Sequence, residues 1–246
     1  MNGFEKNSLY YEIIDEKKKT VRVRYAHWTA KPTGALSIPE SVENEGKKYT
    51  VTEIGGHGSY THTIYDKVPD KRCKNGYREV PKECTKDWRG FERSYITSIK
   101  MPKTITKIGG GVFYECRNLT KVEMSPNVIE IGAIAFGWCT ELEKVVLPQK
   151  IVKIGDRAFW GCKNLKSVNI PPLVEVIEWS TFDYTQIKTI EIPANVNLIK
   201  KEAFGTKNDK YPKEAIIDNS DGNLVIENGA FPAETKITYK GKSLLP

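Results

Sequence analysis

The sequence feature that most constrains the fold is a phenylalanine that returns at a nearly fixed interval through the second half of the chain. The interval is 23 residues three times and then 22, at Phe113, Phe136, Phe159, Phe182 and Phe204. A fixed period of about 20 to 29 residues is typical of a solenoid, in which each repeat buries its apolar edge against its neighbours. We therefore predict a repeat protein.

Other positions keep the same register. An isoleucine precedes each phenylalanine by five residues, and a proline ends a short β-type run in every repeat. These residues are Ile108, Ile131, Ile154, Ile177 and Ile199, with Pro102, Pro126, Pro148, Pro171 and Pro193. Because successive strand side chains take opposite faces, the apolar residues of each run are expected to point inward and their neighbours outward. The two outward rows are Ser98, Lys121, Lys144, Ser167 and Thr189, and Lys100, Glu123, Val146, Asn169 and Glu191.

The repeated text resembles a known family. Lys150 to Leu165 contains Ile154-Gly155, Ala158-Phe159, Cys162 and Asn164-Leu165, a pattern similar to the BspA-type (Treponema pallidum-type) leucine-rich repeat. The stretches from Leu36 to Pro39 and from Gly46 to Gly55 are similar to the first unit of such proteins in Bacteroides-like bacteria. The resemblance covers residues 34–56 and 96–231. It implies a leucine-rich-repeat solenoid of the α/β type, dominated by β structure and coiled as a right-handed superhelix, in a surface or secreted binding protein. Because a fold does not fix a ligand, the partner stays open.

The repeat pattern and its breaks divide the chain into five parts. Apolar and polar residues alternate on both sides of a charged turn at 15–19, which predicts a β-hairpin that caps the N-terminal end of the solenoid, and 236–240 predicts a closing strand. The parts are 1–33, the N-terminal β-hairpin cap; 34–56, a degenerate first repeat; 57–95, an insertion; 96–205, five regular repeats of 22–24 residues; and 206–246, a degenerate last repeat with a C-terminal cap.

The insertion breaks the period. A segment of this length without regular structure inside a compact body is usually functional or disordered, and its aromatic residues argue against plain disorder. Tyr65, Tyr77 and Trp88 are therefore candidate partner-binding residues. Cys73 and Cys84 lie out of the repeat register, and we predict a disulfide between them.

The turn after each phenylalanine carries a large aromatic residue in four repeats. These are Tyr114, Trp138, Trp160 and Tyr184. They form either a ledge that binds a protein or a glycan, or a seal in which each ring lies flat on the next coil. The second interpretation is favoured.

Three cysteines follow their phenylalanines by three residues: Cys116, Cys139 and Cys162. We expect a buried, reduced column that packs among apolar neighbours, since free cysteine behaves as a small hydrophobe. A serine at Cys139 is then expected to cost about 1 to 3 kcal/mol, because its hydroxyl would have no assured partner.

No motif in the sequence favours catalysis, a cofactor or a metal. His57 and His62 with Cys73 and Cys84 do not have the ligand spacing of a compact zinc site. The net charge is +7, but acidic and basic residues interleave, whereas a nucleic-acid interface needs a one-sided basic stripe. No stretch approaches the ~18 apolar residues of a transmembrane helix, and the first six residues contain no signal segment.

These features predict a non-catalytic bacterial leucine-rich-repeat protein, located outside the cell or on its surface. Its partner would be a host protein or a glycan. The protein itself would be a monomer or would associate weakly with itself. The alternative is a structural module that self-associates or docks onto neighbouring domains. A third interpretation, an enzyme on the insertion, would need a pocket that combines His57 or His62 with Cys73 or Cys84.

Overall fold

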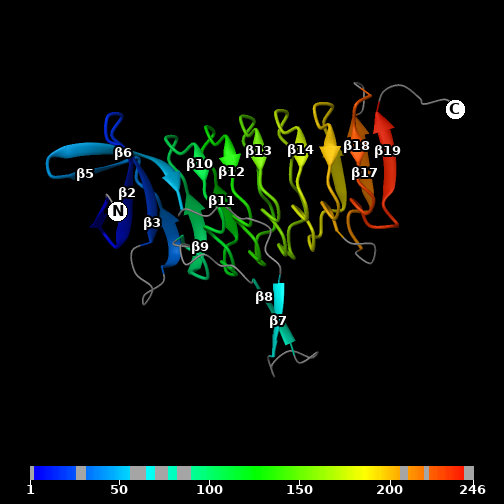
Figure 1. Cartoon of the computed structure of the whole chain (residues 1–246), viewed down its shortest axis with the longest axis horizontal. Coiled ribbons are helices and arrows are strands. Elements are labelled where there is room, and N and C mark those ends of the chain that lie inside the picture. Colours follow the sequence, from blue (N-terminus) through cyan, green and yellow to red (C-terminus); the bar gives the residue numbers. More distant parts are fainter. Residues whose placement is uncertain are drawn as a thin grey trace.

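The coils form a single elongated stack, which Figure 1 shows from the side. The structure is a computed structural model that describes residues 3–25, 32–55, 65–69, 77–81, 90–205, 210–218 and 222–240. Within these ranges the regular elements are the strands β1 to β19, and no helix occurs. The repeat fold is therefore built from strands and turns, which agrees with the predicted β-dominated solenoid.

The proline-terminated runs build the first of two walls. We call it the front wall; its strands are β4 (Thr33–Ser37), β9 (Tyr95–Lys100), β11 (Lys121–Glu123), β15 (Thr189–Ile192), β17 (Glu214–Asp218) and β19 (Lys236–Lys240). They pair in parallel as β4–β9–β11 and as β15–β17–β19. Between these sheets a single bridge joins Lys144 to Ser167. There the Asn169 side chain takes the place of a strand neighbour, since it accepts from Leu147 N and donates to Leu147 O, both at 2.8 Å.

The isoleucine positions build the second wall, which we call the back wall. It contains β6 (Lys47–Ile54), β10 (Lys107–Ile108), β12 (Glu130–Ile131), β13 (Lys153–Ile154), β14 (Val176–Ile177), β16 (Leu198–Ile199) and β18 (Val225–Ile226). The strands pair in parallel as β6–β10–β12–β13 and β14–β16–β18. In each regular repeat the isoleucine that ends the strand is buried, because it faces the space between the two walls.

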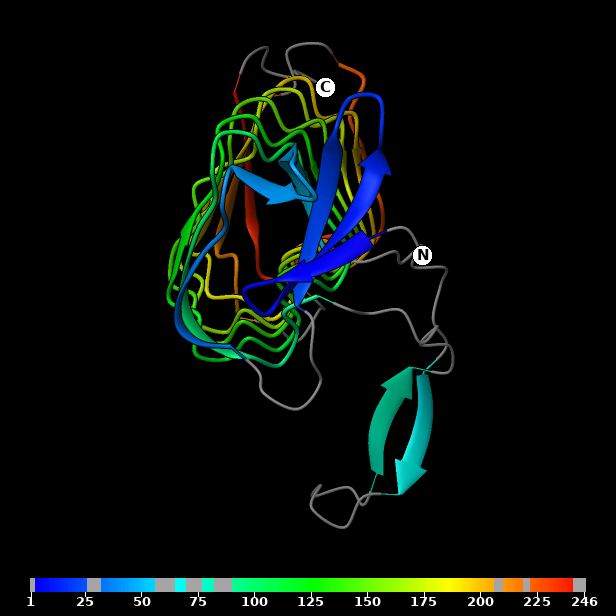
Figure 2. The ribbon, with the colours of Figure 1, turned by 90° about the vertical axis from the view of Figure 1, so that its left-hand side faces the viewer.

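The N-terminal residues extend the back wall. Strands β1 (Gly3–Lys6), β2 (Leu9–Asp15) and β3 (Thr20–Tyr25) pair in antiparallel order, and β3 then pairs in parallel with β6. Strand β5 (Ser41–Asn44) forms an antiparallel hairpin with β6. Figure 2 looks along the stack from this end and shows the N-terminal strands in front of the coils.

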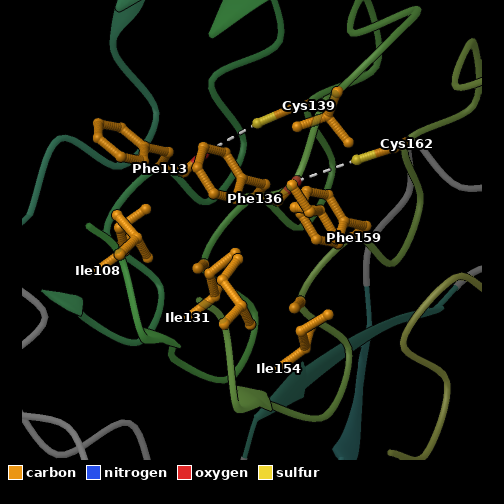
Figure 3. Close-up of a cluster of buried hydrophobic side chains, with 14 of the residues drawn as sticks. Ile108, Phe113, Ile131, Phe136, Cys139, Ile154, Phe159 and Cys162 are labelled. Carbon is orange, nitrogen blue, oxygen red and sulfur yellow. Dashed lines mark hydrogen bonds between the residues drawn. The ribbon is translucent and has the colours of Figure 1, made fainter. Parts of the chain in front are cut away.

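The phenylalanines form one continuous row inside the stack. Neighbouring rings are stacked with centroids 4.8 to 5.7 Å apart, and the row contains Phe91, Phe113, Phe136, Phe159, Phe182, Phe204 and Phe231. Figure 3 shows three of these rings side by side above the isoleucines of the back wall. The row extends by one ring at each end beyond the five phenylalanines from which it was predicted. In particular, the assignment of Phe91 to the insertion is wrong: its side chain is 1% exposed and it is the first ring of the row.

The described part of the insertion is a hairpin of β7 (Tyr65–Pro69) and β8 (Tyr77–Pro81). Figures 1 and 2 both show this hairpin standing apart from the coils. Residues 90–95, in contrast, belong to the stack, since Phe91 N donates to Val112 O at 2.6 Å and β9 begins at Tyr95. Cys73, Cys84 and Trp88 lie outside the described residues, and so does the predicted disulfide.

Candidate binding surface on the edge of the coils

From Phe113 to Phe182, each coil turns around its phenylalanine through two residues with left-handed backbone conformation. One stands two positions before the phenylalanine and the other two positions after it. Their φ angles lie between 51° and 77° at Gly111, Ile134, Arg157, Ser180, Glu202 and Gly229, and at Arg93, Glu115, Trp138, Gly161 and Tyr184. Only glycine adopts this conformation without cost, so the coil imposes it on most of these residues. The turn buries the phenylalanine and directs the following aromatic residue to the outer edge of the stack.

Two of the edge aromatics lie on a glycine of the next coil. A Cβ atom at Gly137 would lie 3.2 Å from Tyr114 Cδ2, and one at Gly161 would lie 2.9 Å from Trp138 Cδ2. Both glycines therefore leave room for the ring of the preceding coil. This arrangement agrees with the favoured interpretation, in which the rings pack against the neighbouring coil.

The tryptophans also contact each other. The Trp138 and Trp160 rings are 5.3 Å apart between centroids at 87°, an edge-to-face arrangement that aromatic pairs prefer. The Lys163 ammonium lies 4.8 Å from the centre of the Trp138 ring. Both indoles are only half-buried, so packing leaves part of each ring on the surface.

A third tryptophan continues the edge. Arg157 places its guanidinium 3.7 Å from the centre of the Trp179 ring and 5.5 Å from that of Trp160. The Trp179 indole N–H donates to Glu202 Oε2 at 3.0 Å. Because Arg157 is 6% exposed and stacked between two indoles, it holds them in a fixed relation.

We call the half-buried edge residues Tyr114, Trp138, Trp160 and Trp179 the aromatic strip. Trp179 was not among the residues predicted from the sequence, although its position carries a signal. It stands three positions before its phenylalanine, where the three preceding repeats have Gly110, Ala133 and Asp156.

The remaining candidate residues are more dispersed. Tyr184 is 48% exposed and occupies a left-handed position one coil beyond Trp160. Tyr65 pairs with Pro81 and Tyr77 with Pro69, so the β7–β8 register places the two tyrosines at opposite ends of the hairpin.

The cysteine column is buried, with Cys116, Cys139 and Cys162 all unbonded to one another. Each thiol donates to the carbonyl oxygen of the phenylalanine one coil earlier, at 3.1 to 3.2 Å, as Figure 3 shows for two of them. The expectation of purely apolar neighbours is therefore wrong. Burial raises the pKa of Cys162 to about 12, and it raises the pKa of Cys139 well above its ordinary value. Thiols held in this neutral form are poor nucleophiles.

The outward rows of the front wall are polar and of mixed sign. Lys121, Lys144, Ser167 and Thr189 are exposed in the first row, and Val146 is 63% exposed in the second. Lys121 and Glu123 form an ion pair at 2.6 Å, which lowers the pKa of the glutamate. Surface pairs of this kind contribute little to stability, and this wall shows no one-sided charge.

The described residues contain no group of three or more His, Cys, Asp or Glu side chains placed to hold a metal ion. They also include no helix with the length and apolar character needed to cross a membrane. His27, His57 and His62 lie outside the described ranges.

Comparison with known proteins identifies similar repeats and similar folds. Residues 88–209 match the model of the BspA type leucine rich repeat region in 6 copies. The structure resembles pneumococcal vaccine antigen PcpA, with a TM-score of 0.59, 19% identity, and coverage of 93% of this chain and 51% of that chain. It also resembles the T. pallidum leucine-rich repeat protein TpLRR, with a TM-score of 0.55, 17% identity, and coverage of 96% and 85%.

A leucine rich cell surface protein from Faecalibacterium prausnitzii has a TM-score of 0.54, 22% identity, and coverage of 92% of this chain and 57% of that one. At these identities the likeness shows the fold alone. The chain spans about half the length of PcpA and of the F. prausnitzii protein. A comparison with curated protein sequences finds no significant match.

Proposed function

Over residues 88–209 the chain belongs to the BspA-type leucine-rich repeat family, and on this basis we propose that it is a non-catalytic binding protein, secreted by a bacterium or displayed on its surface. The three similar structures are named as a vaccine antigen, a repeat protein and a cell surface protein. The names of the vaccine antigen and the cell surface protein support a location at the cell surface.

The observation that carries the proposal is the aromatic strip. Its rings come from neighbouring coils, they are fixed by Gly137, Gly161 and Arg157, and they remain partly exposed. Tryptophan and tyrosine are the usual anchors of binding surfaces, because they contribute a large contact area and lose little conformational entropy on binding. The strip would therefore provide a rigid, aromatic and cationic surface for a host protein or a glycan.

The other parts of the proposal concern the ends and the insertion. The N-terminal strands β1–β3 would cap the right-handed superhelix at one end, and residues 206–246 would close it at the other. The β7–β8 hairpin and its tyrosines would add a second contact surface. Loops that project from a rigid scaffold are common binding elements.

Binding to an array of glycans and purified extracellular proteins tests the proposal. The double variant Trp138→Ala, Trp160→Ala should lose at least tenfold in affinity for any array member that the unchanged protein binds. Tyr95→Ala is the matched control, since Tyr95 is 62% exposed on β9 and belongs to the coil of Phe91, two coils before that of Trp138. Equal binding by the double variant and the control would exclude the strip as the site.

Self-association is a second candidate because no described strand pairs with the outer edge of β19, the last strand of the front wall. The side chains of Ile237 and Tyr239 on β19 are 38% and 47% exposed, although the β17 residues that pair with them are buried. A second copy could cover this strand. A molecular mass that rises with protein concentration, and that returns to the monomer value in Tyr239→Ser, would support this function over the first.

A further inference from the structure

The two walls of the solenoid end differently at the N-terminal side. On the back wall, β6 is followed by β3, which adds to it as a parallel strand. On the front wall, β4 pairs with β9 on one side, and no described strand pairs with its other side. Within the described residues, the chain therefore closes one wall with an extended strand of its own and leaves the equivalent edge of the other wall unpaired.

The backbone groups on this open edge can be assigned from the hydrogen bonds of β4. Ile38 N donates to Lys100 O at 3.2 Å, and Tyr95 N donates to Pro32 O at 3.0 Å, so the even-numbered residues face β9. Because the direction alternates along a strand, the N–H and C=O groups of Ala35 and Ser37 face the opposite edge. Among the described residues nothing hydrogen bonds to them.

A groove of about 530 Å³ lies along this edge. Its volume is in the usual range for ligand sites. Apolar side chains of Leu9, Tyr11 and Leu36 line it, together with small polar residues, and no charged side chain is among its lining residues. Its far rim is the turn between β1 and β2, where Asn7 and Ser8 both have positive φ, as a tight hairpin turn requires.

We propose that this groove binds an extended, uncharged segment of a partner polypeptide, which pairs with the edge of β4 and packs apolar side chains against Leu9, Tyr11 and Leu36. Strand addition to an open sheet edge obtains affinity from main-chain hydrogen bonds and specificity from pockets for alternate side chains. The pairing of β3 with β6 shows that this fold accepts a strand at the equivalent place on the back wall. The site is separate from the aromatic strip, and it does not depend on the function proposed for the strip.

A peptide with the sequence of residues 186–193, in which Lys188→Gln and Glu191→Gln remove the two charges, is a suitable probe. In the protein this segment contains β15, a front-wall strand whose Ile190 and Ile192 both point inward and are 1% exposed. The peptide therefore has the side-chain pattern of the wall to which it would add. The control is the same peptide with N-methyl groups on alternate backbone nitrogens, which cannot form the ladder on that edge.

The protein variants are Ser37→Pro and Ser37→Ala. Proline removes the N–H that faces the groove, and it is tolerated on an edge strand when that N–H is not part of the ladder. Alanine keeps the backbone N–H. We expect the peptide to bind the unchanged protein and Ser37→Ala with equal affinity, and to bind Ser37→Pro at least tenfold more weakly. The N-methylated peptide should also bind at least tenfold more weakly, which keeps the test valid if Ser37→Pro does not fold.

Amide exchange locates the contact. On addition of the peptide, exchange at Ala35 and Ser37 should slow, while exchange at Leu36 should stay unchanged. No binding, equal binding of the N-methylated peptide, or slow exchange at Ala35 and Ser37 in the free monomer would each overturn the proposal. Concentration-dependent dimerisation that is lost in Ser37→Pro would assign the edge to a second copy instead, and would equally overturn it.

Discussion

The phenylalanine row and the aromatic strip come from the same turn and differ in almost every physical respect. The rings of the row are buried, nearly parallel and evenly spaced from Phe91 to Phe231. The rings of the strip belong to residues one or two positions after a phenylalanine or, in Trp179, three positions before one. They are half-buried, and those of the three tryptophans meet edge to face or across a guanidinium. Left-handed residues close to each phenylalanine reverse the chain around its ring, so that the aromatic residue beside it lies at the outer edge of the coil.

The comparison indicates that different residues of one turn stabilise the solenoid and form its candidate binding surface. A ring in the row has its neighbours fixed by the coil spacing, so every repeat needs the same residue there. A ring in the strip needs only a small residue on the next coil, such as Gly137 or Gly161, so its identity and position vary between repeats. We therefore expect substitutions in the row to change the free energy of unfolding, and substitutions in the strip to change binding.

The largest expected effect on stability is that of Phe159→Ala. Its ring is fully buried and stacks on Phe136 and Phe182, so its removal leaves a cavity and should cost about 3 to 5 kcal/mol. Because repeats contact only their neighbours, amide exchange should accelerate most in the two flanking coils. Urea denaturation measures the free energy, and a loss below about 1 kcal/mol would show that the row is not the core.

A smaller effect is expected from exchanging residues at the left-handed position after the phenylalanine. Gly161→Ala should destabilise by about 1 to 2 kcal/mol, because alanine pays for its positive φ and its Cβ would meet Trp138. Glu115→Gly at the equivalent position should be neutral or stabilising by up to about 1 kcal/mol, since glycine relieves the same conformation. Thermal unfolding of both variants checks the prediction: Gly161→Ala should lower the melting temperature, and Glu115→Gly should leave it unchanged or raise it. Equal changes in the two variants would contradict the prediction.

The structure lowers the expected cost of Cys139→Ser from the about 1 to 3 kcal/mol predicted from the sequence to less than about 1 kcal/mol. The serine hydroxyl can donate to Phe113 O, which already accepts from the Cys139 thiol at 3.2 Å. Cys139→Ala, which leaves that position without a donor, is the comparison. If the serine variant is the less stable of the two, the carbonyl does not serve as its partner.

Because burial raises the pKa of these thiols, we also expect the protein to lose a little stability in alkali. In the unfolded chain they ionise from about pH 8.5 upward, whereas in the folded protein burial raises the pKa of Cys162 to about 12. The folded state then binds more protons than the unfolded state between these values, so the stabilisation is complete below pH 8.5 and is lost as pH rises toward 12. Urea denaturation at pH 8 and pH 10.5 should show a smaller decrease for Cys162→Ala than for the unchanged protein.

The period of the phenylalanines was sufficient to predict the stack, because a repeat every 23 residues leaves only neighbouring coils for each ring to contact. The ends of the row were harder to predict. Phe91 keeps the interval, since it precedes Phe113 by 22 residues, but Lys86 stands where the other repeats have an isoleucine, and the segment before it is irregular and charged. Phe231 follows Phe204 after 27 residues and so departs from the interval.

The contacts that side chains make with the backbone and with one another were not predictable from the sequence. The phenylalanine carbonyl that accepts from each thiol belongs to the coil before it, and sequence spacing does not show which groups turn inward there. The stacking of Arg157 on Trp179 similarly depends on the left-handed backbone at Arg157. The groove beside β4 depends on where β1–β3 attach, which is a feature of sheet pairing rather than of residue pattern.

A side-by-side measurement of Phe159→Ala and Trp160→Ala tests the central claim most directly, because the two residues are adjacent in the chain and belong to different sets. For each variant, the free energy of unfolding in urea and the binding to the glycan and protein array are measured. We predict that Phe159→Ala loses about 3 to 5 kcal/mol, and that Trp160→Ala loses no more than about 1.5 kcal/mol while its array binding falls at least tenfold. Equal losses of stability in the two variants, with unchanged binding by Trp160→Ala, would contradict the separation of core and binding surface.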